Sequence, residues 1–384
     1  MSVWDFLIGQ APVVAALTRA IQGATSAGDQ RLDKYAMTHA WLITGPPGSG
    51  RSVAARAFAA GLECAAGGCG QCKACATTLA GTHPDVTVVR TERLSIGVDE
   101  VRDLVRRSAM SPTIGSWQVI IIEDADRVTE RGADALLKAI EEPAAKTIWV
   151  LCAPTADDVI MTVRSRCRAV NLVTPATAAI AALLVNEGID QASADFAARV
   201  CQGHIGRARL HATNPEVATH RRAILDIPAK LVALGPCLEL ASWAVTTAKA
   251  EAEAATAQLD AEESQQLNFA LGLSGTKGTP RGAAGQLKDL EEQQALRAKR
   301  FVRDRLDTVL LELTSYYRDV LVTQTGAADL TNTDYATPIA QIAAATTPEA
   351  TLRCLDAIAD CRQAIMTNVA PLLAFEALMV SLWG

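Results

Sequence analysis

Short apolar runs and stretches of helical spacing alternate through the first 173 residues of the chain. The runs are brief, rich in β-branched residues and bounded by polar or turn residues, and they cover residues 41–44, 86–89, 119–122 and 147–151. Continuous apolar strands of this kind are typical of a parallel sheet that is buried on both faces. Residues 98–108 and 132–142 instead carry apolar side chains at helical spacing. This alternation predicts an α/β layered domain over residues 1–173.

The pattern changes after Pro175, where the strand signal disappears. Residues 174–235 predict several short helices, which we expect to form a small helical lid. Residues 236–384 are rich in Ala, Leu, Glu and Gln and predict a larger helical domain. Within it, residues 248–300 form a charged insert with a Gly- and Thr-rich break at 274–282, which favours a solvated helical hairpin of unassigned role.

The composition is ordinary for a globular protein, with 49% hydrophobic and 20% charged residues among 384. No apolar run approaches the roughly 18 to 20 residues that span a bilayer. The first residues lack the basic and then apolar pattern of a secretory signal. We therefore expect a soluble, cytoplasmic protein. The net charge of −6 argues against nucleic-acid binding by the whole surface.

Four of the ten cysteines lie close together, at Cys64, Cys69, Cys72 and Cys75. Four thiolates satisfy a tetrahedral zinc ion, and C-x-x-C spacing lets turns deliver them. The glycines between them, at 67, 68 and 70, permit such turns. We predict a structural zinc site without an open position for chemistry. His83 is an alternative ligand, although His83-Pro84-Asp85 is more typical of a turn.

A glycine-rich loop follows the first predicted strand, at residues 45–52. It matches the phosphate-binding pattern G-x-x-x-x-G-K-[ST], except that arginine replaces lysine. Backbone N–H groups and a helix N-terminus can face a phosphate there, but an arginine is a longer, planar fork. We predict a nucleotide-binding fold with little hydrolysis. The candidate cofactor-binding residues of the loop are Gly45, Gly48, Gly50, Arg51 and Ser52.

Two carboxylates, Glu123 and Asp124, end the predicted strand 119–122. Acids in this position can hold Mg²⁺ and orient water. The usual order is Asp then Glu. Here the second acid is the shorter one, so its carboxylate would lie farther from the water that it should activate, and a displacement of about 1 Å can greatly reduce the rate. The alternative is that they cap the strand and pair with Arg127 or Arg131. We predict at most weak binding of ATP or ADP with Mg²⁺.

A set of motifs then occurs in order: residues 39–48, the cysteine cluster, and residues 124–127, 135–143 and 165–167. Together they resemble the delta-prime subunits of bacterial DNA polymerase III clamp loaders, which are AAA+ proteins. The resemblance is dense over residues 1–175 and thin beyond them. It implies an AAA+ ATPase-like α/β domain, a helical lid and a helical collar. The collar joins a ring that opens a sliding clamp and loads it on primed DNA.

The resemblance also implies the role of Arg166, in Ser165-Arg166-Cys167. Such an arginine acts in trans, at the ATP site of a neighbouring subunit. The implied partners are gamma/tau-type and delta-type subunits, with the clamp and primer–template DNA reached through the assembly, and no membrane. The chain itself would be a largely non-hydrolysing stator. DNA-directed DNA polymerase activity, which is a nucleotidyltransferase activity, would belong to the assembly and not to this chain.

Two other functions stay open. In the first, the chain is a self-hydrolysing AAA+ ATPase in which Arg51 replaces lysine functionally, and Glu123 and Asp124 bind Mg²⁺ and orient the attacking water. In the second, it is a zinc-dependent nucleic-acid-binding factor. The net charge of −6 and the 4% aromatic content weigh against the second function.

Overall fold

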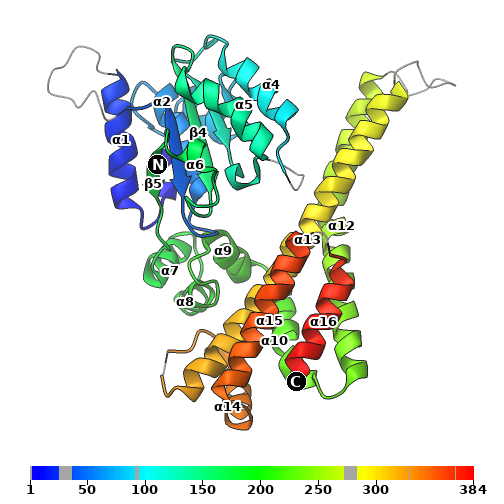
Figure 1. The fold of residues 1–384 in the computed structure, drawn as a ribbon. Coiled ribbons are helices and arrows are strands. Elements are labelled where there is room, and N and C mark those ends of the chain that lie inside the picture. Colours follow the sequence, from blue (N-terminus) through cyan, green and yellow to red (C-terminus); the bar gives the residue numbers. More distant parts are fainter. Residues whose placement is uncertain (1, 26–36, 91–94, 272–282, 328, 368) are drawn as a thin grey trace. The chain divides into compact units, whose positions relative to one another are not determined.

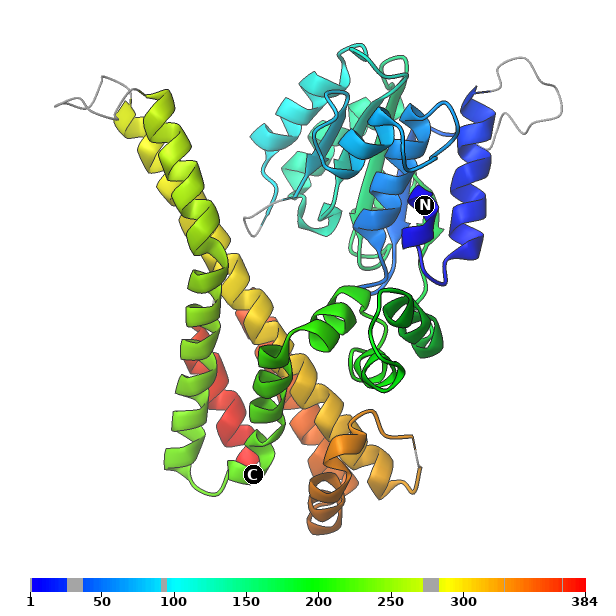
Figure 2. The same cartoon turned by 180° about the vertical axis from the view of Figure 1, so that it is seen from behind.

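The computed structural model describes residues 2–25, 37–90, 95–271, 283–327, 329–367 and 369–384. The chain folds into two compact units, Met1–Thr213 and Asn214–Gly384 (Figures 1 and 2). The first is an α/β unit, and in the described part of the second every element of regular secondary structure is a helix. None of the helices described is both long and apolar enough to cross a membrane.

A parallel sheet forms the centre of the first unit. Its five strands are β1 (Ala40–Thr44), β2 (Val86–Val89), β3 (Gln118–Ile122), β4 (Thr147–Ala153) and β5 (Arg168–Asn171). They lie in the order β2-β3-β4-β1-β5, and every neighbouring pair is parallel. β1, β3 and β4 are buried along their whole length. That burial explains their continuous apolar runs and confirms the predicted α/β class.

Helices cover both faces of the sheet (Figures 1 and 2). They are η1 (Val3–Phe6), α1 (Ala11–Thr25), α2 (Arg51–Glu63), α3 (Lys73–Leu79), α4 (Val98–Ser108), η2 (Ala125–Arg127), α5 (Glu130–Glu141) and α6 (Met161–Arg164). Because side chains alternate along a strand, each face has its own core. Trp41 and Ile43 belong to the core that includes Phe58 of α2. Leu42 and Trp149 belong to the core formed with α4 and α5.

The edge strand β5 was not predicted from the sequence. Of its four residues, only Val170 is buried. An edge strand with one buried side chain produces no apolar run, so the periodicity could not reveal it.

The predicted lid, residues 174–235, is divided between the two units, and three of its helices belong to the first. They are α7 (Thr177–Asn186), α8 (Gln191–Val200) and α9 (Ile205–Thr213), and they share a small core of their own. Gln10, which is 1% exposed, holds the segment that leads to them. Its Nε2 donates to the carbonyl of Val173 at 2.7 Å, and its Oε1 accepts from the N–H of the same residue at 3.1 Å. The start of α1 is therefore tied to the entry of the lid.

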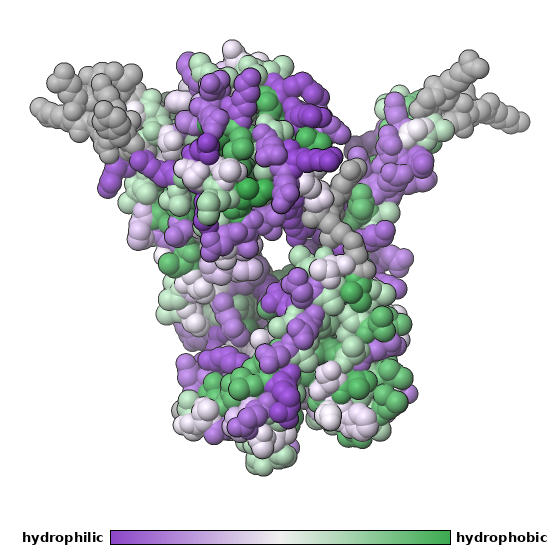
Figure 3. Space-filling model, in the orientation of Figure 1, coloured by the Kyte–Doolittle hydropathy of each residue, from purple (hydrophilic) through white to green (hydrophobic). Residues whose placement is uncertain are grey.

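Two long helices dominate the second unit. Its helices are α10 (Pro215–Leu225), α11 (Ile227–Lys230), α12 (Leu234–Ala270), α13 (Ala283–Gln324), η3 (Thr333–Tyr335), α14 (Ala336–Ala345), α15 (Pro348–Met366) and α16 (Pro371–Trp383). α12 and α13 pack along each other, and their outer part is mostly hydrophilic in Figure 3. Arg297 joins them through ion pairs with Asp260 and Glu263. The break predicted at residues 274–282 lies outside the described residues.

A buried polar network joins α10, α13 and the segment before α14. Arg221 of α10, which is 4% exposed, forms an ion pair with Asp334 at 2.8 Å and donates to Asn332 at 2.5 Å. Asp319 of α13 is fully buried and accepts the N–H of Asn332 at 2.7 Å. Paired and hydrogen-bonded charges are tolerated in an interior where lone ones are not. The network therefore fixes the segment before α14 against α10 and α13.

Candidate functional site

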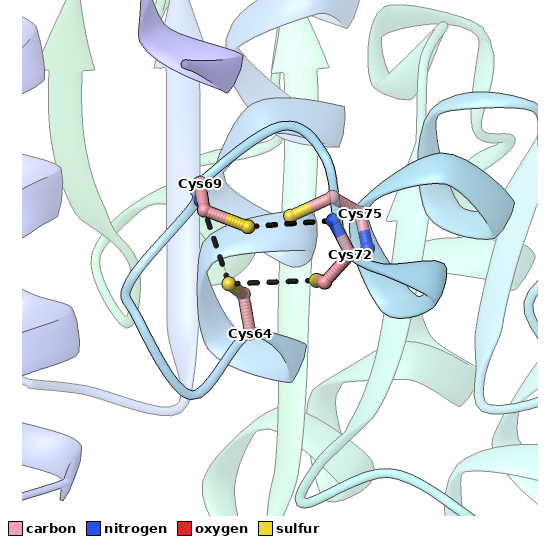
Figure 4. Close-up of side chains that lie close together, drawn as sticks. All are labelled: Cys64, Cys69, Cys72 and Cys75. Carbon is pink, nitrogen blue, oxygen red and sulfur yellow. Dashed lines mark hydrogen bonds between the residues drawn. The ribbon is translucent and has the colours of Figure 1, made fainter. Parts of the chain in front are cut away.

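The four predicted cysteines meet in one cluster beside the sheet. Cys64 ends α2, Cys72 caps the N-terminus of α3, Cys75 lies in α3 and Cys69 lies in the loop between them. Figure 4 shows their side chains pointing toward one another. The four Sγ atoms all lie within 4.8 Å of one another. The Sγ atoms of Cys64 and Cys72 are 3.7 Å apart.

This geometry fits a tetrahedral zinc ion. Zn–S bonds of about 2.3 Å place the sulfurs of a tetrahedral site about 3.8 Å apart. Backbone N–H groups also donate to the sulfurs, from Cys69 to Cys64, from Cys72 to Cys69 and from Cys75 to Cys72, each at 3.4 Å. Such donors stabilise the thiolate, which is the form that binds metal. The cluster can therefore hold zinc with ligands from this chain alone.

The thiols differ in how readily they ionise. Burial raises the pKa of Cys64, but hydrogen bonds from the N–H groups of Cys69, Gly68 and Ala66 outweigh it and lower the pKa to about 6. Burial raises the pKa of Cys75 to about 12. Metal binding must therefore displace a proton from Cys75, whereas Cys64 is already prone to ionise.

The loop of the cluster is fixed to the N-terminal segment. Gly67 and Gly68 have φ of 68° and 111°, a backbone conformation that favours glycine. The carbonyl of Gly67 accepts from Nε1 of Trp4 at 3.2 Å, and that of Gly68 accepts from the N–H of Val3 at 3.2 Å. A side chain at Gly68 would collide with Val3. These contacts bind the loop that carries Cys69 to the N-terminal segment.

His83 lies outside the cluster. It is buried, its Nδ1 accepts from the N–H of Asp85 at 3.2 Å, and its carbonyl accepts from the N–H of Val86. The metal-ligating group found among the described residues consists of the four cysteines without it. The interpretation of His83-Pro84-Asp85 as a turn is thus supported, and its role as an alternative ligand is not.

The glycine-rich loop joins the buried end of β1 to α2. Gly45, Gly48 and Gly50 have φ of 153°, 82° and 96°, so each has a backbone conformation that favours glycine. α2 begins at Arg51, and Ser52 is the second residue of its first turn. The Nη1 atom of Arg51 is buried without a hydrogen-bond partner among the described residues. The loop therefore has the strand–turn–helix setting that a phosphate site requires.

The strand-end acid Glu123 already has a cationic partner. Arg56 of α2 donates to its Oε1 from Nη2 at 2.9 Å and from Nε at 3.1 Å. Glu123 is 9% exposed and the side chain of Arg56 is 34% exposed, so the carboxylate is the buried partner of the pair. Its neighbour Asp124 precedes η2. The guanidinium of Arg56 supplies, from within the chain, the positive charge that a divalent cation would bring to Glu123.

A lid residue lies directly on the glycine-rich loop. A methyl group at Gly48 would come within 2.3 Å of Cγ of His204. The Nδ1 atom of His204 accepts from the N–H of Arg207 at 3.2 Å, which fixes the ring. Burial, and then the charge of Arg207, lower the pKa of His204, so its neutral form is favoured. The lid thus contacts the loop through an uncharged ring.

Gly48→Ala is expected to destabilise the first unit by about 2–4 kcal/mol, because alanine resists the positive φ and collides with His204. Thermal or denaturant unfolding measures the change. His204→Gly removes the collision with the imidazole ring but leaves the Cα of residue 204 at 2.7 Å from the added methyl group, and the φ cost is unchanged. Gly48→Ala should therefore destabilise the His204→Gly chain less than it destabilises the unchanged chain. An equal cost of Gly48→Ala in both backgrounds would contradict the contact.

Three arginines in or beside the turn after α6 have different partners: Arg164 ends α6, Arg166 lies in the turn and Arg168 begins β5. Arg164 forms an ion pair with Asp157. The guanidinium of Arg168 lies 5.5 Å from the ring centroid of Trp41. Arg166 is 39% exposed and forms an ion pair with Glu141 at 2.5 Å. Among the three, Arg166 is the predicted trans residue, and its side chain lies at the surface.

Sequence reasoning missed Arg56, His204 and Glu141. Arg56 lies on the helix that the glycine-rich loop opens, which is the one signal that could have drawn attention to it. His204 and Glu141 reach their partners across the fold, and no local spacing indicates those contacts.

Two family models match the chain. The model described as DNA polymerase III, delta subunit, matches residues 24–176. The model described as DNA polymerase III, delta subunit, C terminal, matches residues 290–382. The first match contains the sheet, the cysteine cluster and the glycine-rich loop, and the second contains most of α13 and the helices that follow it.

Curated proteins and a solved structure are similar to parts of the chain. DNA polymerase III subunit delta' of Pseudomonas aeruginosa is 41% identical over 135 residues, which is 34% of this chain and 41% of that protein. DNA polymerase III subunit gamma/tau of Mycobacterium tuberculosis is 35% identical over 140 residues, which is 35% of this chain and 24% of that protein. A DNA polymerase III gamma subunit-related protein from Thermotoga maritima aligns with 88% of this chain and 92% of its own, at 16% identity and a TM-score of 0.40. The chain spans less than half the length of these curated relatives.

Proposed function

We propose that this chain, which belongs to the clamp-loader family of DNA polymerase III delta' and gamma/tau subunits, acts as a delta-prime-type stator. In this role it supplies Arg166 to the ATP site of a neighbouring subunit and turns over little ATP itself. Its partners are gamma/tau-type and delta-type subunits in the cytoplasm, and it reaches the sliding clamp and primed DNA through the assembly. The division into residues 1–173, 174–235 and 236–384 stays a prediction.

The observation that carries this proposal is the placement of Arg166. Its guanidinium lies at the surface, where another subunit can reach it, and is held there by Glu141. A guanidinium delivered to a γ-phosphate offsets the charge of the transition state, and such residues can contribute about 10³ to 10⁵ in rate.

The chain's own nucleotide site supports the same role. Glu123 is engaged by Arg56, His204 packs on Gly48, and Arg51 replaces the usual lysine. Each change removes or occupies a group that a working site uses for Mg²⁺, for phosphate or for lid movement. Any ATP or ADP with Mg²⁺ would be held by the predicted residues Gly45, Gly48, Gly50, Arg51, Ser52, Glu123 and Asp124.

The cysteine cluster serves the proposal as a structural element. We assign Zn²⁺ to Cys64, Cys69, Cys72 and Cys75, all four of which come from this chain. Zinc would cross-link the end of α2 to α3. With four protein ligands there is no open position for a catalytic water.

The second unit carries a surface suited to a partner subunit. Along α16, a stripe of exposed apolar residues lies on one side of the helix: Leu372, Leu373, Val380 and Trp383, which are 41%, 61%, 37% and 47% exposed. Figure 3 shows hydrophobic residues over the end of the unit where α16 lies. An exposed apolar stripe of this kind is typical of a protein–protein interface. It supports membership of an assembly through the helical unit.

The purified chain alone is expected to show no measurable ATP turnover, and the Arg51→Lys variant is expected to show no brisk turnover either. Lysine would restore the compact charge on the loop, but Glu123 would still be paired with Arg56 and His204 would still cover Gly48. A steady-state phosphate-release assay on both proteins measures this. Brisk hydrolysis by either one would contradict the stator and favour the self-hydrolysing ATPase.

A further inference from the structure

Arg166 is held by a carboxylate from a different helix. Its Nε donates to Oε1 of Glu141 at 2.5 Å, and its Nη2 lies 2.5 Å from the same oxygen. Glu141 is the last residue of α5, whereas Arg166 follows α6. On the other side of the guanidinium, Nη1 donates to the carbonyl of Thr162 at 2.7 Å and lies 3.3 Å from Oγ of Ser165.

These contacts leave part of the guanidinium available. An arginine has five N–H donors in a rigid fork. Oε1 of Glu141 lies on the edge that carries Nε and one hydrogen of Nη2, and the two hydrogens of Nη1 have the carbonyl of Thr162 and Oγ of Ser165 as acceptors. The second hydrogen of Nη2 remains for a phosphate oxygen. The hold on Arg166 therefore fixes its direction without using all of its donors.

We propose that Glu141 is a positioning residue for Arg166, so that the guanidinium is already oriented when a neighbouring subunit brings its γ-phosphate. The inference rests on the proposed trans role of Arg166. A long exposed arginine samples many rotamers, and a residue that selects one of them raises the fraction of time spent in the productive geometry.

The pair serves orientation better than it serves stability. Both side chains are partly exposed, at 39% for Arg166 and 46% for Glu141. Ion pairs with such exposure contribute little to folding. The neighbouring arginines do not share Glu141, since Arg164 pairs with Asp157 and Arg168 lies over Trp41. Glu141 therefore acts on one arginine of the turn.

The test is single-turnover ATP hydrolysis by the reconstituted assembly, with clamp and primed DNA, containing variants of this chain. Glu141→Ala should slow hydrolysis at the adjoining site by about tenfold, because the guanidinium loses its preferred direction. Glu141→Gln should recover most of the rate, since its amide oxygen still accepts from Nε. Glu142→Ala, a change of the next acid in the same turn, should leave the rate unchanged. Size-exclusion chromatography checks that each assembly is intact.

A double variant separates positioning from an independent effect. Glu141→Ala should cost nothing further in an Arg166→Ala background, because the residue that it orients is gone. Additive losses would overturn the proposal, as would an unchanged or faster rate with Glu141→Ala, or a failure of Glu141→Gln to recover activity. If Arg166→Ala itself has no effect, the proposed function fails together with this inference. If Arg166→Ala slows hydrolysis and Glu141→Ala does not, the inference alone fails.

Discussion

Cys72→Ser is expected to abolish zinc binding and, with free zinc at a thousandfold its dissociation constant, to lower the stability of the first unit by about 4 kcal/mol. The variant leaves three sulfurs where a structural zinc requires four ligands. Cys72 is central to the cluster because its Sγ lies 3.7 Å from that of Cys64 and accepts the N–H of Cys75. Its loss therefore also disturbs the N-terminus of α3.

Zinc content and thermal unfolding measure this prediction. A loss of about 4 kcal/mol corresponds to a fall in Tm of about 8–16 °C for a unit of this size. Cys354→Ser is the matched control, since Cys354 is a partly buried thiol of α15 in the other unit. The control should keep its zinc and its Tm. Retention of stoichiometric zinc by Cys72→Ser would contradict the ligand assignment.

The central sheet could be predicted because its strands are buried on both faces. β1, β3 and β4 are continuous apolar runs, and the helices between them repeat apolar residues at helical spacing. Apolar runs and apolar periodicity are local patterns, so the sequence alone predicts these strands and helices. β5 was missed because one buried residue, Val170, gives no period.

The cysteine cluster could be predicted for a similar reason. Its four ligands lie within one short segment, and the spacing of metal ligands is itself a local signal. The structure brings together all four and excludes His83.

The altered nucleotide loop could be recognised in the sequence, but the contacts that occupy the nucleotide site could not. Residues 45–52 depart from the phosphate-binding motif at one position, Arg51. The ion pair of Arg56 with Glu123 spans 67 residues of chain, and His204 reaches Gly48 from the lid. Contacts between distant segments depend on how the layers pack, and neither composition nor periodicity specifies that.

Arg166→Ala is expected to slow ATP hydrolysis at the adjoining subunit's site by about a thousandfold. The alanine variant removes the guanidinium that offsets charge on the γ-phosphate, and no other side chain of the turn has the same placement. Arg166→Lys should recover little, because a lysine lacks the planar fork and cannot make the same contacts with Glu141 and with phosphate.

Arg164→Ala is the matched control for this effect. It removes the arginine that ends α6, two residues before Arg166, and this arginine is engaged by Asp157. The control should leave hydrolysis near the level of the unchanged chain. A similar loss with both variants would mean that the turn as a whole is needed and that Arg166 has no special role.

The most direct test of the trans role is the fast phase of ATP hydrolysis in a reconstituted loader that contains the Arg166→Ala chain, the clamp and primed DNA. With assembly verified by size-exclusion chromatography, we predict that the contribution of the adjoining site to the fast phase disappears. A fast phase of unchanged rate and amplitude would contradict the account, and Arg166 would then be a surface residue of a chain that serves only as a scaffold.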